Sequence, residues 1–415
     1  MQKRKYIHRI LIFSLMFLLS ITSQFLIAQE KSKVENINGV EVISNPKLPI
    51  YKDGLKIKLV FREELSIGQI EGDENYMFGA GISFNTDEEG NFYVTDFANT
   101  KIVKYTPNGE YILSFGRKGQ GPGEFQNMSV TRFDKDGFLY VTDSTNRRIS
   151  FFNKNGEFIR QIHLSERFID LYINSESLYV GRKWDMLQEE KAMKQISVFG
   201  LFNSDLEIME EIYTDEIATP LPSGRDETSI VQYLASSYSV LAFRPEGWLA
   251  LNENDLIYFS CPVDYMINIY SQLGKLQKVI KRDYEPIHIT KNDEESFLNN
   301  MSEGLASSAN IPQGTFKKAL EKIKFPSYKP AFQKFTLMEN GWLFVIVDSI
   351  PDEYALIDLF DQDGEYIAQF ELKMPLERIF FKNGKAYAVA TENDYKFVKR
   401  YNYEIQEFKF YKKTF

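Results

Sequence analysis

The chain of 415 residues is 43% hydrophobic and 26% charged, which fits two or three domains or one repeat architecture and argues against a disordered chain. Its formal net charge of -9 disfavours a nucleic-acid-binding protein, because contacts to phosphates need a basic surface. Cys261 is the single cysteine and there are three histidines, so an internal disulfide and a thiolate zinc cluster are excluded and a His-rich metal site is disfavoured.

Residues 1–28 are predicted to be a cleavable secretory signal peptide. A basic start is followed by the apolar stretch 10–20, which is too short for a comfortable membrane span, and Ala28 fits the last position before the cut. No cysteine lies near this position, so a lipoprotein anchor is excluded, and an uncleaved N-terminal anchor is the alternative. Because no other apolar run could span a membrane, we expect a periplasmic or secreted protein with no membrane span after signal removal.

Two copies of one unit follow in residues 78–164. Residues 87–96 read DEEGNFYVTD, and residues 134–143 read DKDGFLYVTD. The spacing persists after these motifs, where Asn-Gly turns precede further half-apolar segments. Asn-Gly readily supplies the positive φ of a tight hairpin turn, so each unit predicts four strands. The aromatic share of 15% also favours strands and indicates an all-β protein.

Four weaker copies cover residues 168–213, the region around 255–274, 341–364 and 378–403. Six units of this size predict a six-bladed β-propeller of four-stranded antiparallel blades over residues 55–405. The last copy is short, and we expect a strand near residues 55–63 to complete its sheet, because an open ring would leave exposed edges. An N-terminal segment (29–54) and a C-terminal tail (406–415) are expected outside the propeller.

The pattern D-x-x-G-x-x-Y-V-x-D followed by N-x-x-I resembles NHL repeats, and residues 116–125 resemble their linker between blades. The stretch FPSYKPAF at 325–332 and the strand after Gly341 resemble the exported, TolB-like six-bladed propellers of Bacteroidetes-type bacteria. This resemblance implies fold far more than function. Asp96 and Asp143 of the motif are expected to accept hydrogen bonds from backbone amides within their blades. Cys261, which replaces this Asp in the fourth copy, is expected to be a core residue.

One face of the propeller is expected to carry the long connections. The connections between strands one and two and between strands three and four are short, whereas those between strands two and three and between blades are long. The long ones are residues 116–127, 182–193, 214–238 and 286–330. Loops that need not be long usually carry function, so we expect recognition on this decorated face. Capping of the channel or packing of a neighbour is the alternative.

The longest of these segments, 286–330, predicts a short helical insertion between blades four and five. Thr290 and Asp293 fit a capping box, and two apolar stripes at helical spacing follow before Pro326. A role as a lid or docking element rests on its position alone, and plain packing against the blades is the alternative.

The candidate binding residues are mostly basic side chains on the long connections, together with one tryptophan that could stack on a sugar ring and one carboxylate at a strand end. Arg and Trp are common interface anchors. Pairing of the basic residues with neighbouring carboxylates is the alternative, and Trp248 and Trp342 are expected in the core or at the rim. The candidates are Arg117, Lys118, Arg147, Arg148, Arg182, Lys183, Trp184, Arg225 and Asp348.

No catalytic residue is assigned, because nucleophile-elbow, zinc-protease, P-loop and sialidase motifs are absent. The leading hypothesis is a monomeric, non-catalytic propeller that needs no cofactor and binds an envelope or extracellular protein, peptide or glycan. The alternative is a Ca²⁺-type hydrolase or lyase that uses carboxylates at the central channel. Its candidate ligands are Asp96, Asp143, Asn252 and Asp348. A scaffolding subunit of an envelope complex is a third possibility.

Overall fold

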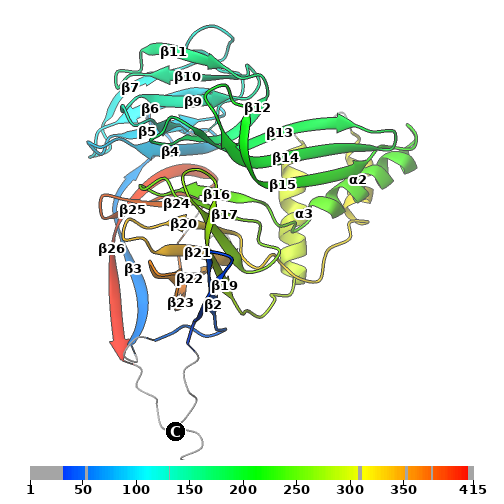
Figure 1. The fold of residues 1–415 in the computed structure, drawn as a ribbon. Helices are drawn as coiled ribbons and strands as arrows, with labels where there is room; N and C mark the ends of the chain where they lie inside the picture. Colours follow the sequence, from blue (N-terminus) through cyan, green and yellow to red (C-terminus); the bar gives the residue numbers. More distant parts are fainter. Residues whose placement is uncertain are drawn as a thin grey trace, which may run out of the picture.

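The computed structural model describes residues 31–51, 55–129, 131–306, 311–350, 354–374 and 377–409. These residues form the predicted six-bladed β-propeller, whose sheets are arranged around a central axis (Figure 1). The predicted signal peptide at 1–28 and residues 410–415 of the predicted tail lie outside the described residues. Among the described residues, no helix is both long enough and apolar enough to cross a membrane.

The blades follow one another along the chain. Blades one and two consist of β4 (Ile82–Thr86), β5 (Phe92–Asp96), β6 (Lys101–Tyr105), β7 (Tyr111–Phe115), β8 (Arg132–Phe133), β9 (Leu139–Asp143), β10 (Arg148–Phe152) and β11 (Phe158–His163). Blades three and four contain β12 (Arg167–Ile173), β13 (Tyr179–Gln188), β14 (Ala192–Phe202), β15 (Ile208–Pro220), β16 (Trp248–Leu251), β17 (Ile257–Ser260), β18 (Met266–Tyr270) and β19 (Leu276–Arg282). Blades five and six contain β20 (Lys334–Leu337), β21 (Leu343–Ile350), β22 (Tyr354–Phe360), β23 (Tyr366–Leu372), β24 (Arg378–Lys382), β25 (Lys385–Glu392) and β26 (Tyr395–Lys409).

A hydrophobic cluster lies between each pair of neighbouring blades. Between blades one and two, for example, Tyr93 and Ile102 pack against Val141 and Phe152, and all four side chains are fully buried. The other five blade interfaces hold equivalent clusters. The high aromatic content therefore serves this packing, because one ring removes a large apolar area from water. These interfaces hold the blades, and hence their innermost strands, at fixed positions around the axis.

The ring closes through β3 (Leu55–Ile67), as predicted. This strand pairs antiparallel with β26 along its whole length, from Ile67 opposite Val398 to Leu55 opposite Lys409. One blade thus combines both ends of the propeller sequence, which leaves no open edge between them. Because β26 reaches Lys409, residues 406–409 of the expected tail belong to the sheet.

The N-terminal segment is not separate from the propeller. β1 (Lys33–Ile37) and β2 (Val40–Asn45) form a hairpin, and β2 pairs parallel with β19, so blade four has six strands. The buried side chain of Asn45 donates to the carbonyl oxygens of Lys281 (3.1 Å) and Gly364 (2.9 Å) and accepts from the amide of Tyr366 (2.8 Å). One amide group therefore fastens the hairpin to blades four and five.

The prediction of a long loop at residues 182–193 is wrong. β13 and β14 pair continuously from Tyr179 opposite Phe202 to Gln188 opposite Met193, so the segment is a strand hairpin that projects beyond the other blades (Figure 1). β15 pairs along the other side of β14 and satisfies its remaining backbone groups. Pairing on both sides extends the sheet although the sequence lacks a Gly or Asn turn signal. Arg182, Lys183 and Trp184 consequently lie on a strand and not on a loop.

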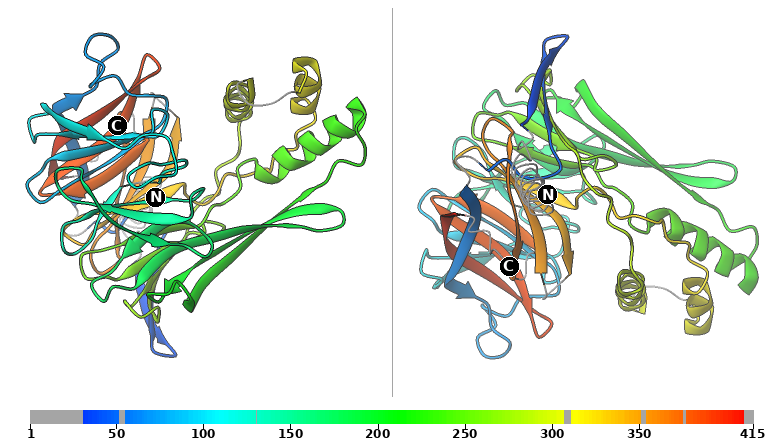
Figure 2. Two further views of the ribbon diagram at one scale, coloured as in Figure 1. Left: turned by 90° about the horizontal axis from the view of Figure 1, so that it is seen from above. Right: turned by 90° about the horizontal axis from the view of Figure 1, so that it is seen from below.

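In the part of the chain that the structure describes, three helices lie to one side of the propeller (Figure 2). α3 (Lys291–Ala306) and α4 (Gln313–Leu320) form the predicted insertion between blades four and five, and the Thr290–Asp293 capping box is confirmed by reciprocal hydrogen bonds of 2.8 and 3.3 Å. α2 (Glu227–Leu241) occupies a segment expected to be a loop. Asp226 caps it by accepting from the Ser229 amide (3.1 Å). Its apolar side packs on α4, which gives this helix the burial that a lone helix lacks.

Candidate functional site

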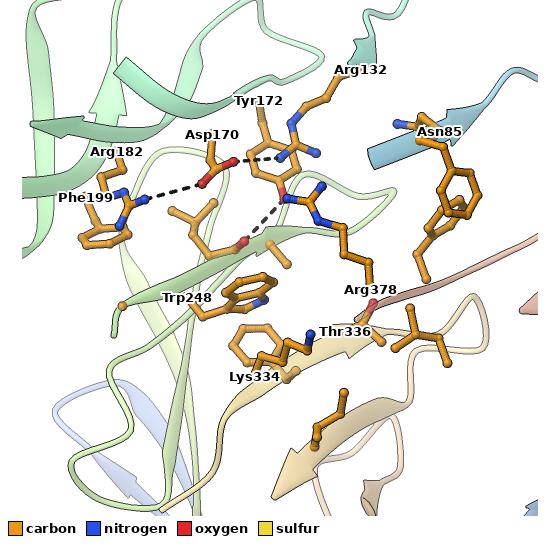
Figure 3. A pocket seen from close by; sticks show the side chains of 18 residues that line it. Asn85, Arg132, Asp170, Tyr172, Arg182, Phe199, Trp248, Lys334, Thr336 and Arg378 are labelled. Atoms are coloured by element: carbon orange, nitrogen blue, oxygen red, sulfur yellow. Dashed lines mark hydrogen bonds and ion pairs between the residues drawn. The ribbon is translucent and has the colours of Figure 1, made fainter. Parts of the chain in front are cut away.

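The innermost strands of all six blades line one cavity of about 320 Å³ in the central channel (Figure 3). The first strand of every blade contributes to the lining of this cavity, because the hydrophobic clusters between blades hold the innermost strand of each sheet next to the axis. The polar lining side chains include Asn85 from β4, Arg132 from β8, Asp170 from β12, Thr336 from β20 and Arg378 from β24. The cavity thus combines residues that are far apart in sequence.

The cavity wall carries more positive than negative charge. Arg132, Arg182, Lys334 and Arg378 line it, and Asp170 is the one carboxylate among its described lining residues. The nearest oxygens of Asp170 lie 3.9 Å from Nη2 of Arg132 and 3.8 Å from Nη2 of Arg182. These distances exceed those of hydrogen bonds, so the carboxylate is shared loosely between two guanidinium groups.

Lys334 and Arg378 are held in place by neutral groups. Nζ of Lys334 donates to the backbone carbonyl of Glu377, and Nη1 of Arg378 donates to Oγ of Ser83 at 2.6 Å. Burial, followed by the nearby charge of Arg378, lowers the pKa of Lys334 to about 8. Burial is also the main cause that lowers the pKa of Arg378. Both shifts indicate that the charged forms are poorly stabilised within the protein itself.

Aromatic rings and aliphatic side chains form most of the remaining surface of the cavity. The guanidinium of Arg132 lies 3.7 Å from the ring centre of Tyr172, and that of Arg182 lies 5.6 Å from the ring centre of Phe199. The sequence predicts Trp248 in the core or at the rim, whereas its ring lines the channel and is 38% exposed. The channel therefore offers flat apolar faces beside its cations.

Replacing Lys334 with Met is expected to stabilise the protein at pH 7, by up to about 3 kcal/mol, and this gain should shrink as the pH rises to 10. The folded-state pKa of Lys334, about 8, lies below its ordinary value of 10.5, so burying the charged amine lowers stability fully below pH 8 and not at all above the unfolded pKa. Urea unfolding of wild type and variant at pH 7 and 10 measures the difference. A difference that is the same at both pH values would contradict the charge explanation.

Among the nine residues predicted to bind, Arg182 alone lines this cavity. Arg148 is buried and donates to the carbonyl oxygens of Gln120, Gly121 and Glu124, so it secures the glycine-rich linker. The alternative of pairing with carboxylates holds for two further basic candidates, Arg117 and Lys183, and the candidate carboxylate Asp348 is itself paired with a lysine. The pairs are Arg117 with Glu124, Lys183 with Glu166, and Asp348 with Lys329.

The remaining four predicted residues lie apart from the channel lining. Lys118, Arg147 and Arg225 are exposed on connections, and Trp184 lies on β13 below the guanidinium of Arg167 (5.1 Å to the ring). The structure therefore does not bring the nine residues together. A signal for the channel was present in the sequence, since charged residues occur in the first strand of four copies, and first strands line the axis. They are Arg132, Asp170, Lys334 and Arg378.

Asp96 and Asp143, two of the side chains predicted as alternative Ca²⁺ ligands, accept hydrogen bonds from backbone amides. Asp96 accepts from the amides of Gly79 (3.1 Å) and Asn99 (3.0 Å), and Asp143 accepts from those of Gln126 (2.8 Å) and Asn127 (3.1 Å), which confirms their expected structural role. Within the described ranges, no three His, Cys, Asp or Glu side chains gather closely enough to hold a metal ion.

Comparisons with known proteins agree with the fold. A family model described as a 6-bladed beta-propeller (DUF5128) matches residues 81–219, which span the first three blades. No curated protein matches the chain in sequence. A structure from Bacteroides fragilis, of a protein assumed to be exported, is 12% identical with a TM-score of 0.51 over 88% of this chain and 99% of that chain. A duf4221 family member from Bacteroides vulgatus is 12% identical with a TM-score of 0.50, over 85% and 99%. At this identity both likenesses show the fold alone.

Proposed function

We propose that this chain is a non-catalytic, monomeric binding propeller that works in the periplasm or outside the cell. It recognises a protein, peptide or glycan on its decorated face and holds part of that ligand in the central channel. The observation that carries this proposal is the cavity of about 320 Å³, into which all six innermost strands direct polar or aromatic side chains. Such concave sites with a few convergent polar groups are the usual form of ligand pockets.

The helices of the decorated face support the same role. A second hollow, of about 540 Å³, lies between the end of α2 and residues 324–330. Val240, Val263 and Tyr328 border it and are 39%, 64% and 47% exposed. Exposed apolar side chains at a polar rim are typical of surfaces that contact other molecules. The assumed export of the Bacteroides fragilis neighbour and the predicted signal peptide support the extracytoplasmic location.

Narrowing the channel tests the proposal. Wild-type residues 29–415 should bind at least one member of a panel of defined oligosaccharides and peptides saturably, and Thr336→Trp, which places an indole in the cavity, should abolish this binding. Asn108→Trp, in an exposed turn of blade one, is the matched control and should bind like wild type. Equal binding by Thr336→Trp would show that the channel is not the pocket. Cleavage of the bound ligand, seen by mass spectrometry, would make the protein an enzyme.

Binding is proposed to need no metal ion. EDTA, Ca²⁺ and Zn²⁺ should therefore leave the thermal midpoint of the chain unchanged, because the candidate carboxylates Asp96, Asp143 and Asp348 are bonded to protein groups. A metal present at about 100 times its Kd would add roughly 2.7 kcal/mol to the free energy of unfolding, which is a shift of about a few degrees. A midpoint raised by Ca²⁺ and reversed by EDTA would favour the metal-dependent hydrolase or lyase.

A further inference from the structure

The positive charge of the channel has no structural explanation within its lining. Four cations come from four different blades, namely blades two, three, five and six, whereas Asp170, the one carboxylate among the described lining residues, pairs loosely with only two of them, Arg132 and Arg182. Their hydrogen bonds and ring contacts are with neutral groups, and the carboxylate of Glu377, outside the lining, acts on Lys334 only through its charge. The neutral groups are the ring of Tyr172 for Arg132, the ring of Phe199 for Arg182, the carbonyl of Glu377 for Lys334 and the hydroxyl of Ser83 for Arg378.

Cations collected in a protein cavity repel one another more strongly than in water, because the effective dielectric constant is lower. A structural role would be met better by apolar residues of similar volume, since buried charges rarely add net stability. Residues that lower stability at a concave site are commonly kept for function. An anion that enters the cavity would replace the repulsion among the cations with attraction, because each guanidinium can then form charge-assisted, forked hydrogen bonds to it.

We propose that the central channel binds an acidic sugar unit, that is, a sugar ring bearing a carboxylate, phosphate or sulfate group. The inference rests on the channel being the binding pocket. The cations of Arg132, Arg182, Lys334 and Arg378 receive the acidic group, and the exposed indole of Trp248 offers a flat apolar face for the ring. The volume lies near the lower end of small-molecule pockets, about 300–1,000 Å³, so a single unit or the end of a chain fits.

The exposed face of Trp248 distinguishes this ligand from an acidic peptide. A carboxylate on a peptide such as Asp-Glu, which has no ring, would satisfy the cations but would leave the indole of Trp248, a residue that is 38% exposed, without a ring-shaped partner. A neutral sugar would cover the ring but leave the repulsion among the cations unchanged. Only a ligand with both features uses both parts of the cavity wall.

Calorimetric titration of residues 29–415 tests the proposal at pH 7 and constant ionic strength, with four probes: glucuronate, glucose 6-phosphate, glucose and an acetylated Asp-Glu dipeptide. At least one of the two acidic sugars should bind saturably, and neither glucose nor the dipeptide should match it. Arg378→Met and Arg132→Met should each weaken this binding about tenfold or more, because each removes a charge-assisted contact. Arg160→Met, on the exposed outer strand of blade two, should bind like wild type.

The stability of Arg378→Met separates a binding role from a structural one. Because the variant removes a half-buried cation next to Lys334, its thermal midpoint should equal or exceed that of wild type while its affinity falls. A lower midpoint together with unchanged affinity would assign Arg378 to structure and overturn the proposal. Equal binding of glucose, binding of the dipeptide alone, or no binding of either acidic sugar would overturn it too. If a neutral ligand from the panel binds and is lost in Thr336→Trp, the proposed function survives and the acidic class does not.

Discussion

Replacing Arg282 with Met should lower the free energy of unfolding by about 3–5 kcal/mol, because it leaves a buried carboxylate without its charge partner. Nη1 of Arg282 lies 2.5 Å from Oδ2 of Asp358, and the two side chains are 7% and 0% exposed. Tyr265 (2.6 Å), Tyr366 (2.9 Å) and Gln369 (2.9 Å) donate the remaining hydrogen bonds to the carboxylate. The cluster joins blade four to blade five where the chain leaves for the helical insertion, so its loss should loosen that interface.

Two further variants isolate the buried charge as the cause. The double variant Arg282→Met with Asp358→Asn removes both charges but keeps an acceptor for the tyrosines, and it should recover most of the lost stability. Lys278→Met breaks an exposed pair with Glu41 (2.8 Å) from the same strand β19, and it should cost less than about 1 kcal/mol. Urea unfolding midpoints at pH 7 measure all three. A double variant as unstable as Arg282→Met would attribute the loss to packing and not to charge.

The propeller could be predicted because its signals are local. Hairpin turns depend on residues within each turn, and Gly109 and Gly156 indeed adopt φ values of 83° and 74° in the turns where the sequence predicts them. The repeated Asp of the second strand bonds amides close to it in sequence, so its role was visible as well. The closing strand β3 could be predicted because the last copy has room for only three strands, whereas each of the other blades needs four.

The N-terminal hairpin could not be predicted in the same way. β2 joins blade four through parallel pairing with β19, and the Asn45 side chain contacts Lys281, which lies 236 residues later in the chain. Nothing within residues 33–45 identifies this partner. The sequence does not predict helix α2 for a related reason, because its apolar residues gain their burial from α4, about 80 residues further along, and the region around its capping residue Asp226 is expected to be a loop.

The candidate site could not be predicted for the same reason, because its residues meet only when distant parts of the chain come together. The sequence predicts basic residues on connections as ligand contacts, yet Arg148 donates to three carbonyl oxygens of the neighbouring linker and Arg117 pairs with Glu124. A glycine-rich linker exposes backbone carbonyls that need donors, and a nearby Arg supplies them. Three of the four channel cations lie on first strands and Arg182 lies on a second strand, all in separate blades, so only the assembled ring shows that they share a cavity.

Replacing Lys329 with Met should also lower the free energy of unfolding by about 3–5 kcal/mol, because two largely buried carboxylates would then face each other without a cation between them. Nζ of Lys329 lies 2.6 Å from Asp293 at the start of α3 and 3.0 Å from Asp348 on β21. The three side chains are 10%, 13% and 6% exposed, so water screens them little. Lys318→Met, which breaks the exposed pair with Glu227 between α4 and α2 (2.8 Å), is the control and should cost less than about 1 kcal/mol.

The loss of stability in Lys329→Met should depend on pH, and the pKa of Asp293 determines the direction of this dependence. Burial alone would raise the pKa of Asp293, but hydrogen bonds from Lys329 and Thr290 lower it below its ordinary value. A carboxyl group with a lowered folded-state pKa stabilises the protein above its unfolded pKa, about 3.9, and this contribution is lost as the pH falls through the folded value. Without Lys329, burial and the facing carboxylate favour protonation of Asp293, so the difference in stability between wild type and variant should narrow as the pH falls from 7 to 4.

Hydrogen exchange in α3 should rise in the variant at pH 7 and fall back toward wild type at the lower pH. A stability difference that stays constant over this range would mean that Lys329 acts through the packing of its aliphatic chain and not through its charge.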